Sequence, residues 1–239
     1  MSIIFKQLFD EDSCTLTYLL ADPLNGDAVI IDSVREHLGL YSTLLQSLEL
    51  RLVWLLETHV HADHMTAAAG LKELTGARTV TGANAGAPCA DRLVDEGDTI
   101  VFGSEVIRVL PTPGHTPGCV SYRWRDRVFS GDALLIGGCG RTDFQGGDAG
   151  TLHDSIMSQL LSLPDETLVF PAHDYHGRRV SSVGQEKLTN QRLIGRSREA
   201  FVTLMNGLNL PKPRMIDEAL PVNLRCGRGP EPLIDVQEA

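Results

Sequence analysis

The sequence predicts an α+β fold in which two packed β-sheets are covered by helices, and three observations predict it. Short apolar segments typical of strands recur along the whole chain, helical periodicity occurs between some of them, and the connections differ in length. A regular Rossmann fold would instead alternate strand and helix throughout. Because 239 residues suffice for one large core but seldom for two, we expect a single domain spanning residues 1–239.

The first predicted elements are a β-hairpin and a helix. Strands are expected at 15–20 and 28–32, because both segments are apolar and the turn sequence Pro-Leu-Asn-Gly-Asp lies between them at 23–27. In the next segment, apolar residues recur at steps of three and four: Leu38, Tyr41, Leu45 and Leu48. This spacing predicts a helix with one apolar face.

The rest of the chain continues this mixture of strands and helices. The sequence Leu-Val-Trp-Leu-Leu at 52–56 is apolar throughout and predicts a strand buried on both faces. A helix is expected at 65–75, because Gly76 is a typical helix end, and a helical stripe of apolar residues runs through 152–161. Four more segments have the apolar pattern of strands: 105–110, 119–123, 127–130 and 168–170.

Composition and charge narrow the classes of function. Hydrophobic residues make up 42% and charged residues 22%, which is typical of a soluble globular protein, and no apolar stretch is long enough to cross a membrane. The formal net charge of -10 would repel a polyphosphate backbone, so nucleic acid is not an expected partner. The first ten residues have neither a signal-peptide pattern nor a transit-peptide pattern, so we expect a cytoplasmic protein.

The cysteines point in the same direction. There are five, they are scattered, and no two form a Cys-x-x-Cys pair. This pattern argues against a disulfide framework and against a structural zinc site, and it fits a reducing cytosol. Cys226 is interpreted as a small buried hydrophobic residue rather than as a redox thiol.

The segment His-Val-His-Ala-Asp-His, directly after the buried strand at 52–56, is the strongest local signal. It offers four metal ligands within six residues. Side chains two apart in an extended segment point to the same side, so we expect His59 and His61 to converge. Asp63 and His64 are expected to open the following helix, whose positive end favours anionic ligands.

Three further candidate ligands, His115, Asp132 and His173, each lie at or beside the end of a predicted strand. The alternative is that all seven residues are ordinary polar loop residues. That many imidazoles and carboxylates at the ends of apolar strands would be costly to desolvate without a shared cation. We therefore expect a metal site at one edge of the fold.

These residues resemble the metal-binding motifs of the metallo-β-lactamase superfamily, which are His-x-His-x-Asp-His followed by a separated His, Asp and His. The resemblance implies an αββα metallo-β-lactamase sandwich with the metal at its open edge. It does not choose the function, because this scaffold hosts thioesterases, lactamases, nucleases and oxygenases.

Segments in the second half resemble the persulfide dioxygenases, also called sulfur dioxygenases, and the match runs from about Phe5 to Gly227. The segments that carry it are 138–145, 171–177, 208–213 and 221–227. The resemblance implies oxidation of glutathione persulfide, with O2 and water, to sulfite and glutathione. It also implies a homodimer.

The same resemblance assigns roles to the candidate ligands. One Fe(II) per subunit would be held by His59, His115 and Asp132, a facial set of three that leaves positions for O2 and substrate. The residues that would orient these ligands and hold water are His61, Asp63, His64 and His173. Since all seven residues of a two-metal site are present, mononuclear iron and binuclear zinc both stay open at this point.

The anionic glutathione part of the substrate requires local cations. Arg141, Lys212 and Arg214 are the candidates for its carboxylates, and Tyr175 is a candidate hydroxyl donor. A short C-terminal extension, about residues 178–239, is expected to complete this substrate pocket.

Two alternatives remain. The first is a dizinc thioester hydrolase of the glyoxalase II type acting on S-acylglutathione. Glyoxalase II has aromatic and acidic residues after its Gly-Arg, where this chain has Thr142, Asp143 and Phe144, and it has a longer C-terminal domain. The second alternative is a metal-bearing binding module without catalysis.

Overall fold

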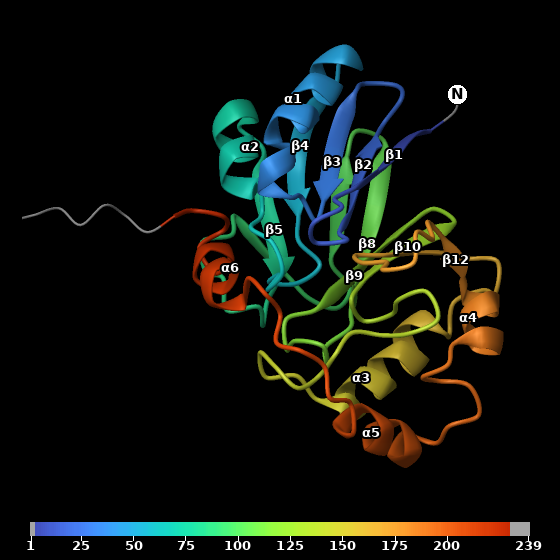
Figure 1. Cartoon of the computed structure of the whole chain (residues 1–239). Coiled ribbons are helices and arrows are strands. Elements are labelled where there is room, and N and C mark those ends of the chain that lie inside the picture. Colours follow the sequence, from blue (N-terminus) through green and yellow to red (C-terminus); the bar gives the residue numbers. More distant parts are fainter. Residues whose placement is uncertain (1–2, 230–239) are drawn as a thin grey trace, which may run out of the picture.

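Two six-stranded β-sheets pack face to face, with helices on their outer faces (Figure 1). The computed structural model describes residues 3–229, so the end of the expected C-terminal extension, 230–239, lies outside the described residues. In the first sheet, β1, β2 and β3 pair antiparallel, and the remaining pairs are parallel. Its strands, in spatial order, are β1 (Ile4–Phe9), β2 (Leu16–Ala21), β3 (Asp27–Ile31), β4 (Arg51–Leu56), β5 (Arg78–Gly82) and β6 (Arg92–Val94).

The second sheet is antiparallel except for the parallel pair of β10 and β11. Its strands, in spatial order, are β12 (Ser181–Ser182), β11 (Leu168–Pro171), β10 (Arg127–Gly131), β9 (Val120–Trp124), β8 (Glu105–Pro111) and β7 (Thr99–Phe102). The predicted fold of two packed sheets with helices is therefore confirmed.

Strand β2 shows how the sequence builds the layers. Leu16, Tyr18 and Leu20 point into the core between the sheets, while the alternate residues Leu19 and Ala21 belong to the core beneath the helices. The period of two along a strand explains this division. Both faces of the strand are buried, and each large apolar side chain contributes roughly 1.5–3 kcal/mol to folding.

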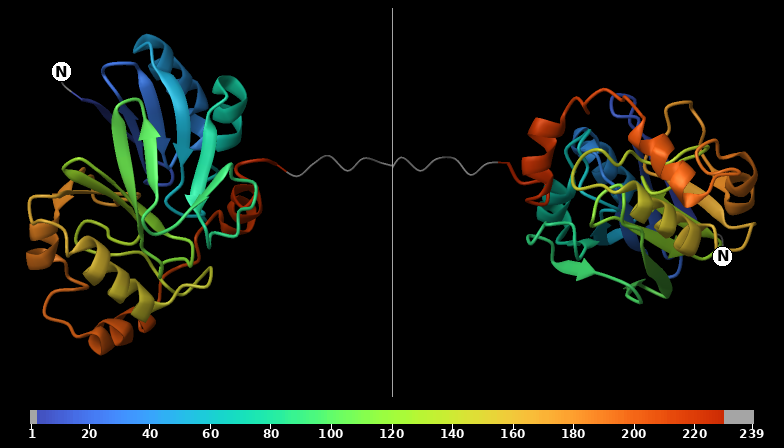
Figure 2. Two further views of the ribbon diagram at one scale, coloured as in Figure 1. Left: turned by 180° about the vertical axis from the view of Figure 1, so that it is seen from behind. Right: turned by 90° about the horizontal axis from the view of Figure 1, so that it is seen from below.

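The helices form the outer layers (Figure 2). The first sheet is covered by α1 (Leu38–Ser47), which follows a 3-10 turn at Arg35–His37, and by α2 (Ala68–Thr75). The second sheet is covered by α3 (Ala149–Ser155) with its π-helical continuation Ile156–Leu160 and by α4 (Val183–Thr189), and α5 (Arg198–Asn206) packs against α3. The last helix, α6 (Ile216–Asn223), lies near the end of β5, as both figures show.

The helix expected at 65–75 starts later than predicted. It begins only at Ala68, so Asp63 and His64 lie in the preceding loop, and the expectation that they open the helix was wrong. The backbone of Thr66 is engaged elsewhere, because its amide donates to Asn223 Oδ1 and it forms a bridge with Val34. Asp63 and His64 are therefore not in the first turn of the helix, where the positive end of its dipole would stabilise a negative charge.

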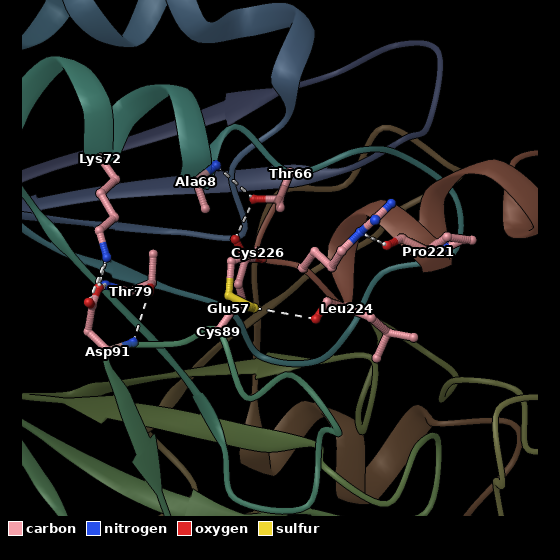
Figure 3. Close-up of a disulfide and its surroundings, with 11 residues drawn as sticks. Glu57, Thr66, Ala68, Lys72, Thr79, Cys89, Asp91, Pro221, Leu224 and Cys226 are labelled. Carbon is pink, nitrogen blue, oxygen red and sulfur yellow. Dashed lines mark hydrogen bonds and ion pairs between the residues drawn. A yellow bond between two sulfur atoms is a disulfide. The ribbon is translucent and has the colours of Figure 1, made fainter. Parts of the chain in front are cut away.

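A disulfide joins Cys89, on the loop after β5, to Cys226, just after α6 (Figure 3). The prediction from the cysteine pattern was wrong at this pair, and Cys226 is half-buried rather than a core residue. The two cysteines are 137 positions apart, so only the fold brings them together. The free thiols are Cys14, Cys119 and Cys139.

Within residues 3–229, no helix is both long enough and apolar enough to span a bilayer.

Candidate metal centre

Seven candidate ligands meet at one edge of the sandwich, where four strands end. The loop after β4 supplies four of them, and the loops after β8, β10 and β11 supply one each: His59, His61, Asp63, His64, His115, Asp132 and His173. The strands are buried, and the polar side chains begin where each strand stops. Sequence reasoning placed all seven at strand ends, and the structure brings them together.

One group consists of His59, His115 and Asp132, whose potential ligand atoms all lie within 4.8 Å of one another. All three side chains are buried. The rings of His59 and His115 are 4.9 Å apart between centroids and nearly perpendicular, at 84°. Two imidazoles and one carboxylate at this spacing can hold one divalent metal ion.

The backbone fixes the tautomer of His115. Its Nδ1 lies 2.6 Å from the carbonyl oxygen of Arg141, which can only accept, so Nδ1 carries the proton. The lone pair is then on Nε2, which lies 3.7 Å from Asp132 Oδ2. The nitrogen that is free to bind a metal therefore faces the carboxylate that would share that metal.

A hydrogen-bond relay orients His59 in the same way. The Thr58 hydroxyl donates to Asp32 Oδ2 at 2.8 Å, so it can only accept from His59 Nδ1, 3.0 Å away. This leaves the Nε2 lone pair of His59 free. Burial, together with the charge of His61, lowers the pKa of His59 well below its ordinary value, which keeps the ring neutral and able to bind a metal.

Asp32 is a residue that sequence reasoning missed. It accepts from both the amide and the hydroxyl of Thr58, at 2.7 and 2.8 Å, and so anchors the start of the metal-binding loop. Its φ of 52° turns the chain sharply at the end of β3. The signal in the sequence was a single carboxylate directly after the apolar run of β3, which is too short a pattern to stand out.

A second group consists of His61, Asp63, His64 and His173. His173 joins it to the first, because its Nδ1 lies 2.6 Å from Asp132 Oδ1 and its Nε2 lies 2.9 Å from Asp63 Oδ2. Burial opposes a charge on His173, but the two carboxylates outweigh it and raise its pKa well above the ordinary value. Burial also acts to raise the pKa of Asp132, but His173 and the neighbouring histidines hold it below its usual range.

Several buried ligand atoms at this edge have no hydrogen-bond partner among the described residues. They are His61 Nδ1, His61 Nε2, His64 Nε2 and Glu57 Oε2. His61 Nε2 nevertheless lies 3.1 Å from Asp32 Oδ1, at ion-pair distance, which leaves His61 Nδ1 and His64 Nε2 as the nitrogens without a partner. An unsatisfied buried polar atom costs roughly 1–3 kcal/mol, and coordination of a metal ion would remove that cost for these two nitrogens. The residues therefore fit a transition-metal site, with imidazole and carboxylate donors.

A pocket of about 490 Å³ opens beside the first group and is lined by all four predicted substrate-binding residues. Tyr175 is 64% exposed, and its ring is nearly parallel to that of His173, with 6.2 Å between centroids. Lys212 forms an ion pair with Asp217 at 2.7 Å. The side chain of Arg214 has no ion pair and no hydrogen bond within residues 3–229, so it is the basic residue of the pocket that is most available to a ligand.

Arg141 was predicted to bind a substrate carboxylate, but most of its contacts are with groups of the protein itself. Its guanidinium makes two hydrogen bonds to the Asp143 carboxylate, both 2.7 Å, and lies over the Phe144 ring. It also donates to the carbonyls of Pro211 and Leu210, at 2.6 and 3.3 Å. Four of its five N–H groups are thus used within the protein, which leaves one on Nη1 for a ligand.

Known proteins are similar to this chain in sequence and in structure. The family model of the metallo-beta-lactamase superfamily matches residues 15–173. The human protein named persulfide dioxygenase ETHE1, mitochondrial, is 47% identical over 94% of this chain and 89% of its own length. The chain belongs to the persulfide dioxygenase family of this superfamily. The sequence resemblance is thereby confirmed.

Other relatives fit this membership. The crystal structure of ETHE1 from Myxococcus xanthus has a TM-score of 0.93 and 50% identity, and the match covers 94% of this chain and all of that one. A beta-lactamase hydrolase-like protein of Agrobacterium fabrum is 36% identical over 95% of this chain and 61% of its own length. The persulfide dioxygenases are therefore markedly more similar to this chain than that hydrolase-like relative.

Proposed function

We propose that this chain oxidises a persulfide with dioxygen at a single Fe(II) held by His59, His115 and Asp132. The observation that carries the proposal is the group of three buried ligands beside the 490 Å³ pocket, in a chain 47% identical to a persulfide dioxygenase. Two imidazoles and one carboxylate are the donor set typical of non-haem Fe(II) oxygenases. When bound, Fe(II) supplies the redox chemistry that lets dioxygen react with sulfur.

The proposed substrate is glutathione persulfide, and the overall reaction balances with one O2 and one water. The S–S bond breaks, the terminal sulfur takes up three oxygen atoms as sulfite, and the other sulfur leaves as the thiol of glutathione. Sulfur is oxidised and O2 is reduced, and two protons are released when sulfite is written as the dianion. No other oxidant or reductant is required.

The protein's own residues orient the reactants and handle protons. The proton on His115 Nδ1 is held by the Arg141 carbonyl, and the proton on His59 Nδ1 is held by Thr58, so both Nε2 atoms stay available as ligands. His173 lies between Asp132 and Asp63, which makes it the best-placed group to hold a proton beside the first group of ligands.

The other end of the substrate would lie along the pocket formed with the C-terminal extension. Leu210, Pro211 and Pro213 line that side, next to Arg214. Arg214 is exposed, and a guanidinium can bind a carboxylate through two hydrogen bonds. We assign the glutathione carboxylates to Arg214 first, then to Lys212 and the remaining N–H of Arg141, with Tyr175 as a hydroxyl donor at the rim.

A homodimer completes the proposal, and the cytoplasmic location stays a prediction from the sequence. The disulfide removes the support that the cysteine pattern gave to a cytosolic location, and the human relative carries "mitochondrial" in its name. Fractionation of the source cells and light scattering of the purified protein test these two points.

One observation favours a second candidate, a dizinc thioester hydrolase. The second group of ligands is complete, and its orphaned nitrogens would be satisfied by a second metal ion. The two groups of ligands would then hold two metal ions, which would activate a water for attack on a thioester.

A single experiment separates the candidates. Purified protein is analysed for metals and then mixed with glutathione persulfide in an oxygen electrode cell, and S-lactoylglutathione is tested in parallel. We expect about one iron per chain, oxygen uptake with sulfite formation, and no thioester hydrolysis. Two zinc ions per chain with thioester hydrolysis and no oxygen uptake would establish the second candidate instead.

A further inference from the structure

The segment from Asn223 to Gly227 packs against the back of the metal-binding loop. Asn223 is the last residue of α6, and its side chain is buried. Its Nδ2 donates to the carbonyls of His61 and His64, at 2.9 and 2.8 Å. Its Oδ1 accepts from the amide of Thr66 at 2.9 Å.

One amide side chain thus satisfies three backbone groups of a loop that lacks regular secondary structure. The loop after β4 has no ladder of its own between His59 and Thr66, so its backbone groups must find other partners. Asn223 spans the turn from His61 to His64, which carries the candidate ligands. A substitution that removes these bonds would let the ligand side chains take other orientations.

The segment is fastened at its far end in two ways. The Cys89–Cys226 disulfide joins it to the loop after β5, as Figure 3 shows. Arg35 Nη2 also donates to the carbonyl of Gly227 at 2.7 Å. Gly227 has a φ of +85°, and a Cβ there would lie 2.9 Å from the carbonyl oxygen of Thr66, so the chain comes close to the loop.

The disulfide lies close to the loop after β4, which carries His59 to His64, as well as to α6. A single cavity is lined by Cys226 and Asn223 on one side and by His59, His61 and Thr66 on the other. The loop of Cys89 is itself held, because Asp91 accepts from the amide of Thr79 on β5 (Figure 3). The disulfide therefore connects α6 to an anchored part of the first sheet.

We propose that Asn223 is a positioning residue for the metal centre and that the Cys89–Cys226 disulfide keeps Asn223 seated against the His59–His64 loop. Reduction of the disulfide by a dithiol breaks the S–S bond, converts both cysteines to thiols and oxidises the dithiol to its own disulfide. The metal centre would then hold its ion less tightly in thiol-rich conditions. This inference rests on the proposed metal site but not on the proposed reaction.

The test is a thermodynamic cycle on the full-length chain. Four metal-free proteins are compared: wild type, Asn223→Asp, the Cys89→Ser/Cys226→Ser double variant and the combined triple variant. Each is titrated with Fe(II) under anaerobic conditions, and separately with Zn(II), against a competing chelator. Asn223→Asp keeps the size and the acceptor for Thr66 but loses both donated bonds. Arg225→Ala, an exposed neighbour, is the control.

We expect Asn223→Asp to raise the metal Kd about 10- to 100-fold, as is typical when a group that orients metal ligands is lost. The double variant should raise the Kd by roughly threefold to tenfold, and the triple variant should equal Asn223→Asp, because the disulfide acts through Asn223. Melting temperatures of the metal-free proteins distinguish a loss of ligand positioning from general destabilisation. General destabilisation changes the melting temperature but not the metal Kd of the folded protein. If Asn223→Asp fails to fold, Asn223→Ser replaces it throughout.

An unchanged Kd in the Asn223 variant would overturn the proposal, and so would a disulfide effect of equal size with and without Asn223. If the wild type binds Zn(II) but not Fe(II), the proposed iron enzyme is refuted. The proposal for Asn223 is then still tested, because the same variants are compared by their Kd for Zn(II). Binding of neither metal would refute both.

Discussion

His173 donates a hydrogen bond of 2.6 Å from Nδ1 to Oδ1 of Asp132, while the other oxygen of Asp132 faces Nε2 of His115. The two oxygens of one carboxylate therefore have separate tasks: one is held by a protonated imidazole and the other is left for the metal. We therefore propose that His173 orients Asp132 and does not share the metal of the first group.

The first prediction follows for His173→Gln. We expect it to keep most of its iron while its turnover with glutathione persulfide falls about 10- to 100-fold, because Asp132 loses its orientation but remains a ligand. Iron content and oxygen uptake are measured on the same preparation. Loss of iron as complete as in a His59→Ala variant would show that His173 is itself a metal ligand.

The second prediction concerns Asp132→Ala. Two histidines cannot hold a labile divalent iron, so we expect this variant to lose most of its iron and nearly all oxygen uptake. It also removes the carboxylate that raises the pKa of His173, so the buried imidazole should become neutral at a lower pH. Metal analysis and NMR titration of His173 check the two effects, and full iron content would refute the ligand assignment.

The third prediction is that Arg214→Ala lowers activity more than Lys212→Ala does, with Arg225→Ala, an exposed arginine outside the pocket, as the control. Arg214 has no ion pair within the described residues, whereas Lys212 is paired with Asp217. A charge-assisted bond to a carboxylate contributes about 1.5–3 kcal/mol, so Arg214→Ala should lower kcat/KM by roughly tenfold to a hundredfold, mainly through KM. Equal effects of Arg214→Ala and Lys212→Ala would contradict this ranking, and an equal effect of Arg225→Ala would argue against a specific role of Arg214.

The fourth prediction is for Arg141→Ala, and it differs from what the sequence indicated. Because four of five N–H donors of Arg141 bind Asp143 and the carbonyls at 210 and 211, its loss should free the Leu210–Arg214 wall of the pocket. We expect a lower melting temperature and a similar loss of kcat/KM for glutathione persulfide and for a small persulfide without carboxylates. A loss confined to glutathione persulfide would show that Arg141 binds the carboxylates directly.

The comparison of Arg141 with His115 shows what the sequence could predict. The sequence correctly predicted that His115 lies at the edge of the fold where the other candidate ligands lie. That prediction needed only a histidine close to the end of a predicted strand, because strand ends meet at one edge of a sheet. Two of the contacts of Arg141 are with the carbonyls of Leu210 and Pro211, about 70 positions away, and no local pattern encodes these two contacts. The same limit applies to Asn223 and to the Cys89–Cys226 disulfide, whose partners meet only when α6 reaches the first sheet.

The predicted start of α2 was wrong for a related reason. The apolar periodicity and Gly76 indicated a helix over 65–75, but local propensity yields to tertiary hydrogen bonds when the two compete. Here Asn223 and Val34 engage the backbone of Thr66, so the helix begins three residues late. The irregular loop that results is what allows His61, Asp63 and His64 to point toward one centre.

The last prediction concerns acid stability and Asp91, which fastens the Cys89 loop to the first sheet. Burial acts to raise the pKa of Asp91, but hydrogen bonds from Lys72 and from the amide and hydroxyl of Thr79 outweigh it and lower the pKa to about 2, from 3.8. A carboxyl whose pKa is depressed on folding stabilises the folded state above its unfolded pKa, and that stability disappears as pH falls through the folded pKa. The window for Asp91 is therefore about pH 4 down to about pH 2.

The experiment compares metal-free wild type with Asp91→Asn by denaturant unfolding from pH 6 to pH 2. The shift corresponds to about 1–2 kcal/mol after allowance for the partial exposure of the ion pair. We expect the wild type to be more stable by this amount at pH 6 and the difference to shrink toward zero near pH 2. Lys72→Met should narrow the difference without abolishing it, because the bonds from Thr79 remain. A difference that is constant across this range would show that the charge of Asp91 is not what stabilises the loop, and that its contribution comes from packing alone.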